Sequence, residues 1–252
     1  MALEKRHLVT AGRLAAALGA LTLRGPSRRA AWFVHDLLWL YPTLRRNCAW
    51  HGEVVTHFDT TEREVWLTLD DGPDPRDTPE ILDLLAAHNA LATFFVVGKK
   101  VERHRALVRR ITAAGHTLGN HTQTHPSATW WALPRPVVSR EIARCNQAIL
   151  TATGQAPQWF RSPVGMNNLS IHPAARRNSL RVIGWNAEGR DGCPAAPTQI
   201  VNRILSTVQP GSIILLHESG GSKHRALTLA RLLERLSGEG YRCVLPADSA
   251  LR

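Results

Sequence analysis

The feature that most constrains the fold is the alternation of short apolar segments with amphipathic ones from residue 64 onward. Short apolar segments are typical of buried strands, and the segments between them have the spacing of helices. A repeated strand-helix order is typical of a parallel sheet. The predicted strands are 65–69, 92–97, 116–120, 158–160, 181–185, 212–216 and 241–245, and the predicted helices are 79–88, 101–114, 137–153, 197–208 and 223–236.

The number of these repeats favours a barrel over an open sheet. A (β/α) barrel has about eight strands, whereas an open doubly wound sheet commonly has about five or six. The chain has 252 residues, 44% of them hydrophobic, and barrels of about 200 to 250 residues routinely form one domain. We predict an α/β fold: a distorted (β/α) barrel of about seven or eight parallel strands at residues 61–252, with an N-terminal helical extension.

Residues 1–60 differ from the rest and form the predicted extension. Residues 8–23 are largely apolar and follow Lys5 and Arg6, as in a signal peptide, but Arg13 interrupts this apolar segment. The segment is also too short to cross a membrane, which needs about 20 apolar residues. This segment is compatible with a weak signal peptide, a membrane-surface helix or a plain amphipathic helix. Residues 32–41 have helical apolar spacing, which favours packing on the bottom of the barrel and, second, on a membrane. We expect a cell-envelope protein slightly more than a cytoplasmic one.

The formal net charge of +11 favours anionic partners, such as phosphorylated glycans, acidic cell-wall polymer or lipid. The arginines are scattered, without a long basic run or a basic motif interleaved with aromatic residues. We therefore expect no nucleic-acid partner.

Unusual polar residues follow one predicted strand after another. The carboxyl ends of barrel strands form the catalytic face, so residues distant in sequence are expected to meet there. They are Asp70 and Asp71 after the first strand, His121 and His125 after the third, Arg161 after the fourth, Asp191 after the fifth and His217 after the sixth.

The acidic pair and the two histidines together predict a metal site. By itself, Asp70-Asp71-Gly72-Pro73 is more often a turn that ends a strand. His121 and His125, four residues apart, can present both rings to one ion, and Asp71 would complete a site of two histidines and one carboxylate. We expect one divalent ion, zinc first, although cobalt, nickel, manganese and iron fit the same ligands.

His217 ends an apolar segment and is a candidate general acid, because the pKa of imidazole is near neutrality. Asp191 is a candidate to hold that imidazole charged. A structural histidine at the edge of the core is the alternative for His217.

In this order the motifs resemble those of the polysaccharide deacetylases, the nodulation-type chitooligosaccharide deacetylase family or carbohydrate esterase family four. The resemblance covers about residues 64–245. T-F-D-D-G-P matches residues 68–73 with Leu69 in place of Phe, H-[ST]-x-x-H matches 121–125, R-x-P matches 161–163 and L-x-H matches 215–217. The aromatic residue after R-x-P is replaced by Val164, and the fourth motif, D-x-x-D-[WY], is matched poorly at 188–192, where Asp191 remains and Gly192 replaces the aromatic residue.

The resemblance implies a role for each matched position. It implies that Asp71, His121 and His125 bind the metal, that Asp70 is the catalytic base and that Arg161 orients it. His217 would be the acid, oriented by Asp191, and a backbone N–H near Val164 would hold the oxyanion. It places Pro163, Val164 and Leu215 at the substrate, and Trp185 is a candidate to replace the missing aromatic wall, with a buried core position as its alternative.

The implied reaction is metal-dependent removal of an acetyl or other small acyl group from the nitrogen of an amino sugar in a glycan. Anionic and lipid-linked glycans are among the candidate substrates. Three alternatives remain at this stage. They are a catalytically weak glycan-binding protein on the same scaffold, a deacylase of a non-glycan amide and a non-haem iron oxygenase, whose metal ligands are of the same kind.

Overall fold

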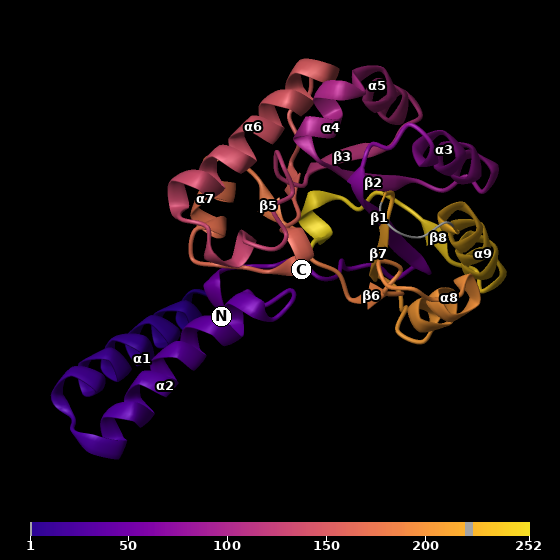
Figure 1. Cartoon of the computed structure of the whole chain (residues 1–252). Coiled ribbons are helices and arrows are strands. Elements are labelled where there is room, and N and C mark those ends of the chain that lie inside the picture. The colour runs from indigo at the N-terminus through magenta and orange to yellow at the C-terminus, as the bar shows by residue number, and fades with distance from the viewer. Residues whose placement is uncertain (1, 220–223) are drawn as a thin grey trace.

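The computed structural model describes residues 2–219 and 224–252. Strands lie at the centre with helices around them, and two helices extend away from this body (Figure 1). The described strands are β1 (Glu64–Gly72), β2 (Ala92–Val96), β3 (Thr117–Asn120), β4 (Trp159–Phe160), β5 (Arg181–Val182), β6 (Ala187–Glu188), β7 (Ile213–His217) and β8 (Arg242–Cys243). The α-helices are α1 (Ala2–Thr22), α2 (Gly25–Leu44), α3 (Asp77–Ala87), α4 (Gly98–Arg103), α5 (Arg105–Ala113), α6 (Arg135–Thr153), α7 (Ile171–Arg177), α8 (Pro197–Leu205) and α9 (Arg225–Gly238).

The sheet is parallel and has the order β5-β4-β3-β2-β1-β7-β6, with β8 pairing the beginning of β1. Strands β5 and β6 are the two edges, and single bridges from Val55 to Ile183 and from His57 to Ser212 lie near them. This arrangement, with helices around the strands, confirms the predicted distorted (β/α) barrel.

Several predicted boundaries were wrong. The helix predicted at 101–114 is two helices, α4 and α5, that break at His104. Val101, Val108 and Ile111 are all buried and keep helical spacing across the break, so periodicity does not reveal it. The strand predicted at 181–185 is only β5, and β6 and α7 were missed because such short elements carry little pattern. Lys223, the predicted start of the last helix, lies outside the described residues, as do the side chains of Lys5 and Arg6.

The alternation along β1 explains which side chains reach the barrel interior. Val65, Leu67 and Leu69 belong to the apolar cluster that includes residues of the surrounding helices, whereas Trp66 packs in a second cluster with Phe95. Successive side chains of a strand point to opposite faces. Thr68 and Asp70 therefore lie on the same face of β1 as Trp66, inside the barrel.

Helices α1 and α2 form a hairpin that projects from the barrel (Figure 1). The carboxyl end of α2 meets the barrel, where the ring centroids of Trp39 and Trp131 are 5.9 Å apart and Pro42 and Thr43 are buried. Residue 131 follows β3, so this contact is on the side of the barrel where the strands end. None of the described helices has the length and apolar character needed to cross a membrane.

Candidate active site at the carboxyl ends of the strands

A bulge in β1 turns both acidic residues toward the site. The pairing of β1 with β2 shifts between Asp70 and Gly72, so that Asp71 is the extra residue, and its φ is 74°. Adjacent residues of a regular strand point to opposite faces, and a bulge redirects one of them. The predicted strand ended at residue 69, but β1 continues to Gly72 and carries both carboxylates.

Asp70 is held by a buried arginine. Nη1 of Arg161 donates to Oδ1 of Asp70 over 2.8 Å and to Oγ1 of Thr68 over 2.6 Å, and the guanidinium lies 4.2 Å from the ring centre of Phe95. Arg161 also donates to the carbonyl oxygens of Ile183 and Gly184. Both charged side chains are almost completely buried, so Asp70 has little freedom to turn away from the site.

Asp71, His121 and His125 offer three ligand atoms that all lie within 4.8 Å of one another. Nε2 of His121 and Nε2 of His125 are 3.5 and 3.3 Å from Oδ1 of Asp71. That oxygen is buried and has no hydrogen-bond partner. A buried carboxylate oxygen without a donor is costly, and a cation would satisfy it.

The proton positions on the two histidines also fit a cation. Nδ1 of His121 lies 2.7 Å from the carbonyl oxygen of Arg161, and a carbonyl can only accept, so Nδ1 donates. In the neutral ring, Nε2 then keeps a lone pair toward Asp71. Burial, followed by the neighbouring His121, lowers the pKa of His125 to about 4, so this ring is neutral near pH 7 and can also donate a lone pair.

The loop that carries both histidines follows β3 and is not helical. Oδ1 of Asn120 accepts from the N–H of Thr122, and Oγ1 of Thr122 accepts from the N–H of His125. Thr122 and His125 have φ values of 68° and 53°, a region that costs free energy for residues other than glycine. The loop bonds offset this cost and bring the two ring centres to 4.7 Å.

His217 ends β7, directly beside Asp70 in the register of β1 and β7. Asp191 holds it twice: Oδ1 lies 2.8 Å from Nδ1 of the ring, and Oδ2 accepts from the backbone N–H over 2.8 Å. Burial lowers the pKa of His217, but the hydrogen bond and charge of Asp191, with Asp70 and Asp71, outweigh it and raise the pKa to about 9. The imidazole therefore carries a proton near pH 7.

The four predicted substrate-binding residues differ in exposure. Val164 is 36% exposed and has a φ of 57°. Pro163, Trp185 and Leu215 are buried. Trp185 packs in the core cluster, 5.6 Å from the guanidinium of Arg161 and in contact with the backbone at Gly165.

Gly192 leaves space beside the candidate acid. A Cβ atom built on Gly192 would meet only Cε1 of His217, at 4.0 Å. An aromatic side chain at this position would therefore extend next to the imidazole, as the missing wall of the fourth motif requires. The departure from the motif at Gly192 therefore lies beside His217, and the hydrogen bonds between Asp191 and His217 are present.

Two supporting residues were missed by sequence reasoning. Nζ of Lys100 donates to the carbonyl oxygen of Asp71 over 2.6 Å and to Ser219. Glu218 is buried behind Gly72 and accepts from Thr78. The only sequence feature that could have drawn attention to Glu218 is its position directly after His217. No local feature marks Lys100, which lies near the start of a helix and reaches Asp71 only in the folded chain.

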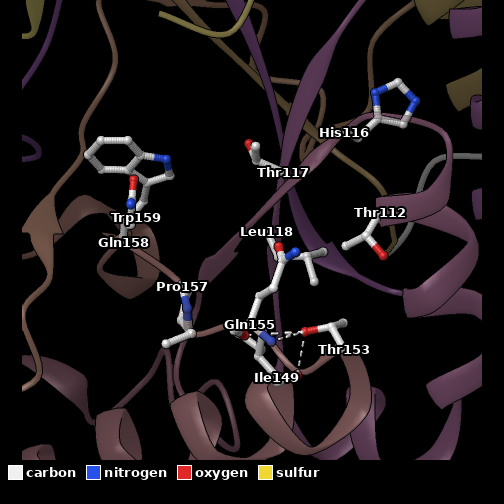
Figure 2. A pocket seen from close by; sticks show the side chains of 11 residues that line it. Thr112, His116, Thr117, Leu118, Ile149, Thr153, Gln155, Pro157, Gln158 and Trp159 are labelled. Atoms are coloured by element: carbon white, nitrogen blue, oxygen red, sulfur yellow. Dashed lines mark hydrogen bonds between the residues drawn. The ribbon is translucent and has the colours of Figure 1, made fainter. Parts of the chain in front are cut away.

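A cavity of about 220 Å³ lies at the other end of the strands, away from these residues. Figure 2 shows its lining side chains from the ends of α5 and α6 and the beginnings of β3 and β4, including His116, Thr153 and Trp159. The amino ends of barrel strands serve stability rather than catalysis, and this cavity is not part of the candidate site.

Comparisons with known proteins identify the family of this chain. The model of the polysaccharide deacetylase family matches residues 57–183. A chitooligosaccharide deacetylase of Sinorhizobium fredii is 40% identical over 199 residues, which cover 74% of this chain and 92% of the relative. A solved peptidoglycan N-acetylglucosamine deacetylase in complex with a benzamide compound superposes with a TM-score of 0.69 at 30% identity, covering 75% of this chain and 88% of that one.

A solved pseudoenzyme of carbohydrate esterase family four from Bacillus anthracis also superposes with a TM-score of 0.69, at 25% identity, covering 75% of this chain and 66% of that one. The likeness of the fold is therefore shared by an enzyme and a pseudoenzyme. The family model and the relative of 40% identity, together with the motifs gathered at the strand ends, show that this chain belongs to the polysaccharide deacetylase family, a family of hydrolases of non-peptide carbon–nitrogen bonds.

Proposed function

We propose that this chain removes an acetyl or other small acyl group from the amide nitrogen of an amino sugar in a glycan, with one divalent metal ion as cofactor. One observation carries the proposal. The three candidate ligand atoms, the buried carboxylate that we assign as the base (Asp70) and the imidazole that we assign as the acid (His217) lie together at the carboxyl ends of the strands. A binding protein has no need for the base and the acid in addition to the metal ligands.

Asp71, His121 and His125 would hold the ion, zinc first. A bound divalent ion makes a coordinated water more acidic and polarises a carbonyl group. The unpartnered oxygen of Asp71 and the lone pairs of the two imidazoles supply a donor set that suits such an ion.

The residues of this chain would move the protons. Asp70, held by Arg161, takes a proton from the attacking water as the new carbon–oxygen bond forms. A backbone N–H near Val164 is the candidate donor to the developing oxyanion. His217, held by Asp191, gives its proton to the amide nitrogen as the carbon–nitrogen bond breaks. The products are a carboxylate, acetate for an acetyl group, and a free amine on the sugar.

The names of the relatives support a proposal for the sugar. One is named a chitooligosaccharide deacetylase and another a peptidoglycan N-acetylglucosamine deacetylase, so N-acetylglucosamine is the sugar we propose. The open space beside Gly192 suits an acyl group larger than acetyl as well.

Acetate release tests the proposal. Full-length protein is stripped with a chelator, reloaded separately with zinc, cobalt, nickel or manganese, and mixed with chitin oligosaccharides or peptidoglycan. We expect metal-dependent release from at least one substrate, and release that is slower by about a hundredfold or more in the Asp70→Asn variant. The matched control is Asp83→Asn, which changes an exposed surface aspartate. Glycan binding by metal-loaded protein without any acetate would identify a binding protein and overturn the enzymatic proposal.

A further inference from the structure

The described exposed surface of α1, from residue 8 onward, is mostly apolar. Every described side chain that is exposed between residues 8 and 22 belongs to leucine, alanine or threonine. Leu8, Leu14, Leu18 and Leu21 follow one another at helical spacing, and Leu8 is 71% exposed. Arg13 is not on this surface, because its side chain is only partly exposed and its Nε is buried.

Helix α2 has a second apolar surface. Phe33, Val34, Leu37, Tyr41 and Leu44 are exposed at intervals of one to four residues along one side, and Phe33 is 68% exposed. The two helices pack through smaller residues, such as Gly12 against Leu38 and Gly19 against Ala31. The large apolar side chains are therefore directed away from the contact between the helices. We call the exposed apolar residues of α1 and α2 the hairpin surface.

The hairpin also carries positive charge at its turn. Arg24, Arg28 and Arg29 are exposed, and no carboxylate in the described part of the chain forms an ion pair with them. Between residues 8 and 44 the sequence has four arginines and a single acidic residue, Asp36. Trp32 and Tyr41 are exposed on α2, and such aromatic rings are favoured where one side is apolar and the other is in water.

We propose that the hairpin surface lies on an anionic lipid bilayer, parallel to the membrane plane. Exposed apolar stripes with neighbouring arginines are the properties of helices that bind at the interface, and they do not require a helix that crosses the bilayer. The charge decides between this occupant and a second copy of the chain. A second copy brings the same net charge of +11, whereas an anionic surface complements it.

The hairpin is connected directly to the catalytic face. After α2, Nη1 of Arg46 donates to Glu188 over 3.0 Å, and the N–H of Asn47 donates to the carbonyl oxygen of Gly165 over 3.0 Å. Residues 165 and 188 border the third and fourth motifs. Docking would therefore hold the site near the membrane, where a membrane-proximal or lipid-linked glycan would reach it.

Vesicle binding by the full-length protein tests the proposal. The probes are vesicles of phosphatidylcholine alone and vesicles that also contain phosphatidylglycerol, with cosedimentation as the readout. We expect binding to the anionic vesicles, weakened by salt, and weak binding to the neutral ones. Replacing Arg28 with serine should weaken binding about fivefold, because one basic residue near an anionic surface contributes about 1 kcal/mol.

A matched pair of variants locates the surface. Phe33→Asp with Leu37→Asp should reduce vesicle binding at least about tenfold, since both apolar side chains would leave the interface. The control is Leu91→Asp with Leu150→Asp, two leucines of the barrel that are 37% and 40% exposed, and it should bind as the unaltered chain does. Circular dichroism reports folding, and hydrolysis of a soluble oligosaccharide should be unchanged in both variants.

Fluorescence quenching provides a second readout on a conservative variant. Brominated lipid should quench the tryptophan fluorescence of the unaltered chain more than that of Trp32→Phe. The proposal is overturned if the chain does not bind anionic vesicles, or if it binds neutral vesicles as strongly as anionic ones. It is also overturned if both aspartate pairs reduce binding equally, or if quenching is the same in Trp32→Phe as in the unaltered chain. A dimer that depends on Phe33 and Leu37, without vesicle binding, would identify a second copy as the occupant.

Discussion

Asp70 and Arg161 are 91 residues apart in the sequence, yet Nη1 of Arg161 donates a hydrogen bond of 2.8 Å to Oδ1 of Asp70 inside the barrel. Arg161 is completely buried and also contacts Thr68, two backbone carbonyls and the rings of Phe95 and Trp185. A buried charge with this many partners is part of the framework as well as the site. It orients the carboxylate that we propose as the base.

Removing this arginine should therefore cost stability as well as activity. Arg161→Met leaves the Asp70 carboxylate buried without its partner, and breaking a buried ion pair costs about 3–5 kcal/mol. Urea unfolding measures the loss. The double variant with Asp70→Asn should recover part of it, and a double variant as unstable as Arg161→Met alone would show that the pair is not the cause.

Metal binding should depend on three side chains. Asp71→Ala, His121→Ala and His125→Ala each remove a ligand, so zinc content after dialysis should fall in all three, measured by elemental analysis. Asp70→Asn should keep the metal and lose about a hundredfold or more of kcat, because a general base contributes about 10²–10⁴-fold. Loss of metal from Asp70→Asn would instead make this residue a ligand.

The acid should matter most for a poor leaving group. His217→Ala should reduce cleavage of an N-acetyl amide far more than cleavage of an acetyl ester with a good leaving group, since an amine needs a proton to leave and an activated phenolate does not. The measurement is the ratio of kcat/KM for the two substrates. An unchanged ratio would contradict the assignment of His217 as the acid.

The fall in activity at alkaline pH should reflect the loss of the proton from His217. Its pKa of about 9 means that the proton is lost above that pH, and a bound divalent cation lowers the value, so activity should fall with an apparent pKa at or below 9. Asp191→Asn removes a charge that raises this pKa and should move this fall in activity to lower pH. If the alkaline loss of activity occurs at the same pH in Asp191→Asn, that loss does not come from the titration of His217.

The stability of the protein should depend on Glu218 between about pH 5 and 8. Burial raises the pKa of Glu218 from 4.5 to about 8. In that range the folded chain keeps a proton that the unfolded chain has lost, so stability falls as pH rises. Glu218→Gln, which resembles the protonated form, should stabilise the protein by about 2–3 kcal/mol at pH 7 and by little at pH 4.

Thermal unfolding at both pH values measures this effect, with Glu234→Gln on the exposed side of α9 as the control. An equal gain at pH 4 and pH 7 would exclude a titration effect. A gain in the control variant would show that the effect does not come from the buried position.

The local sequence was sufficient to predict most of the architecture and to nominate the members of the candidate site. Strands and helices follow from apolar periodicity, because a buried face needs apolar side chains at the period of its own backbone. Motifs such as Asp70-Asp71 and His121 to His125 are specific enough, taken together, to indicate the family of the chain. Once the strands are parallel, their carboxyl ends must share one face, so the site residues could be expected there.

The tertiary structure decided how these residues face one another. The bulge at Asp71 turns two adjacent carboxylates into one site, and pairing with β2 creates it, so no local pattern predicts it. Lys100 and Glu218 acquire their partners only when distant strands and helices meet. The direction of the α1–α2 hairpin is likewise a tertiary property. Apolar periodicity predicts that one face of a helix will be covered, but it does not predict which partner will cover that face.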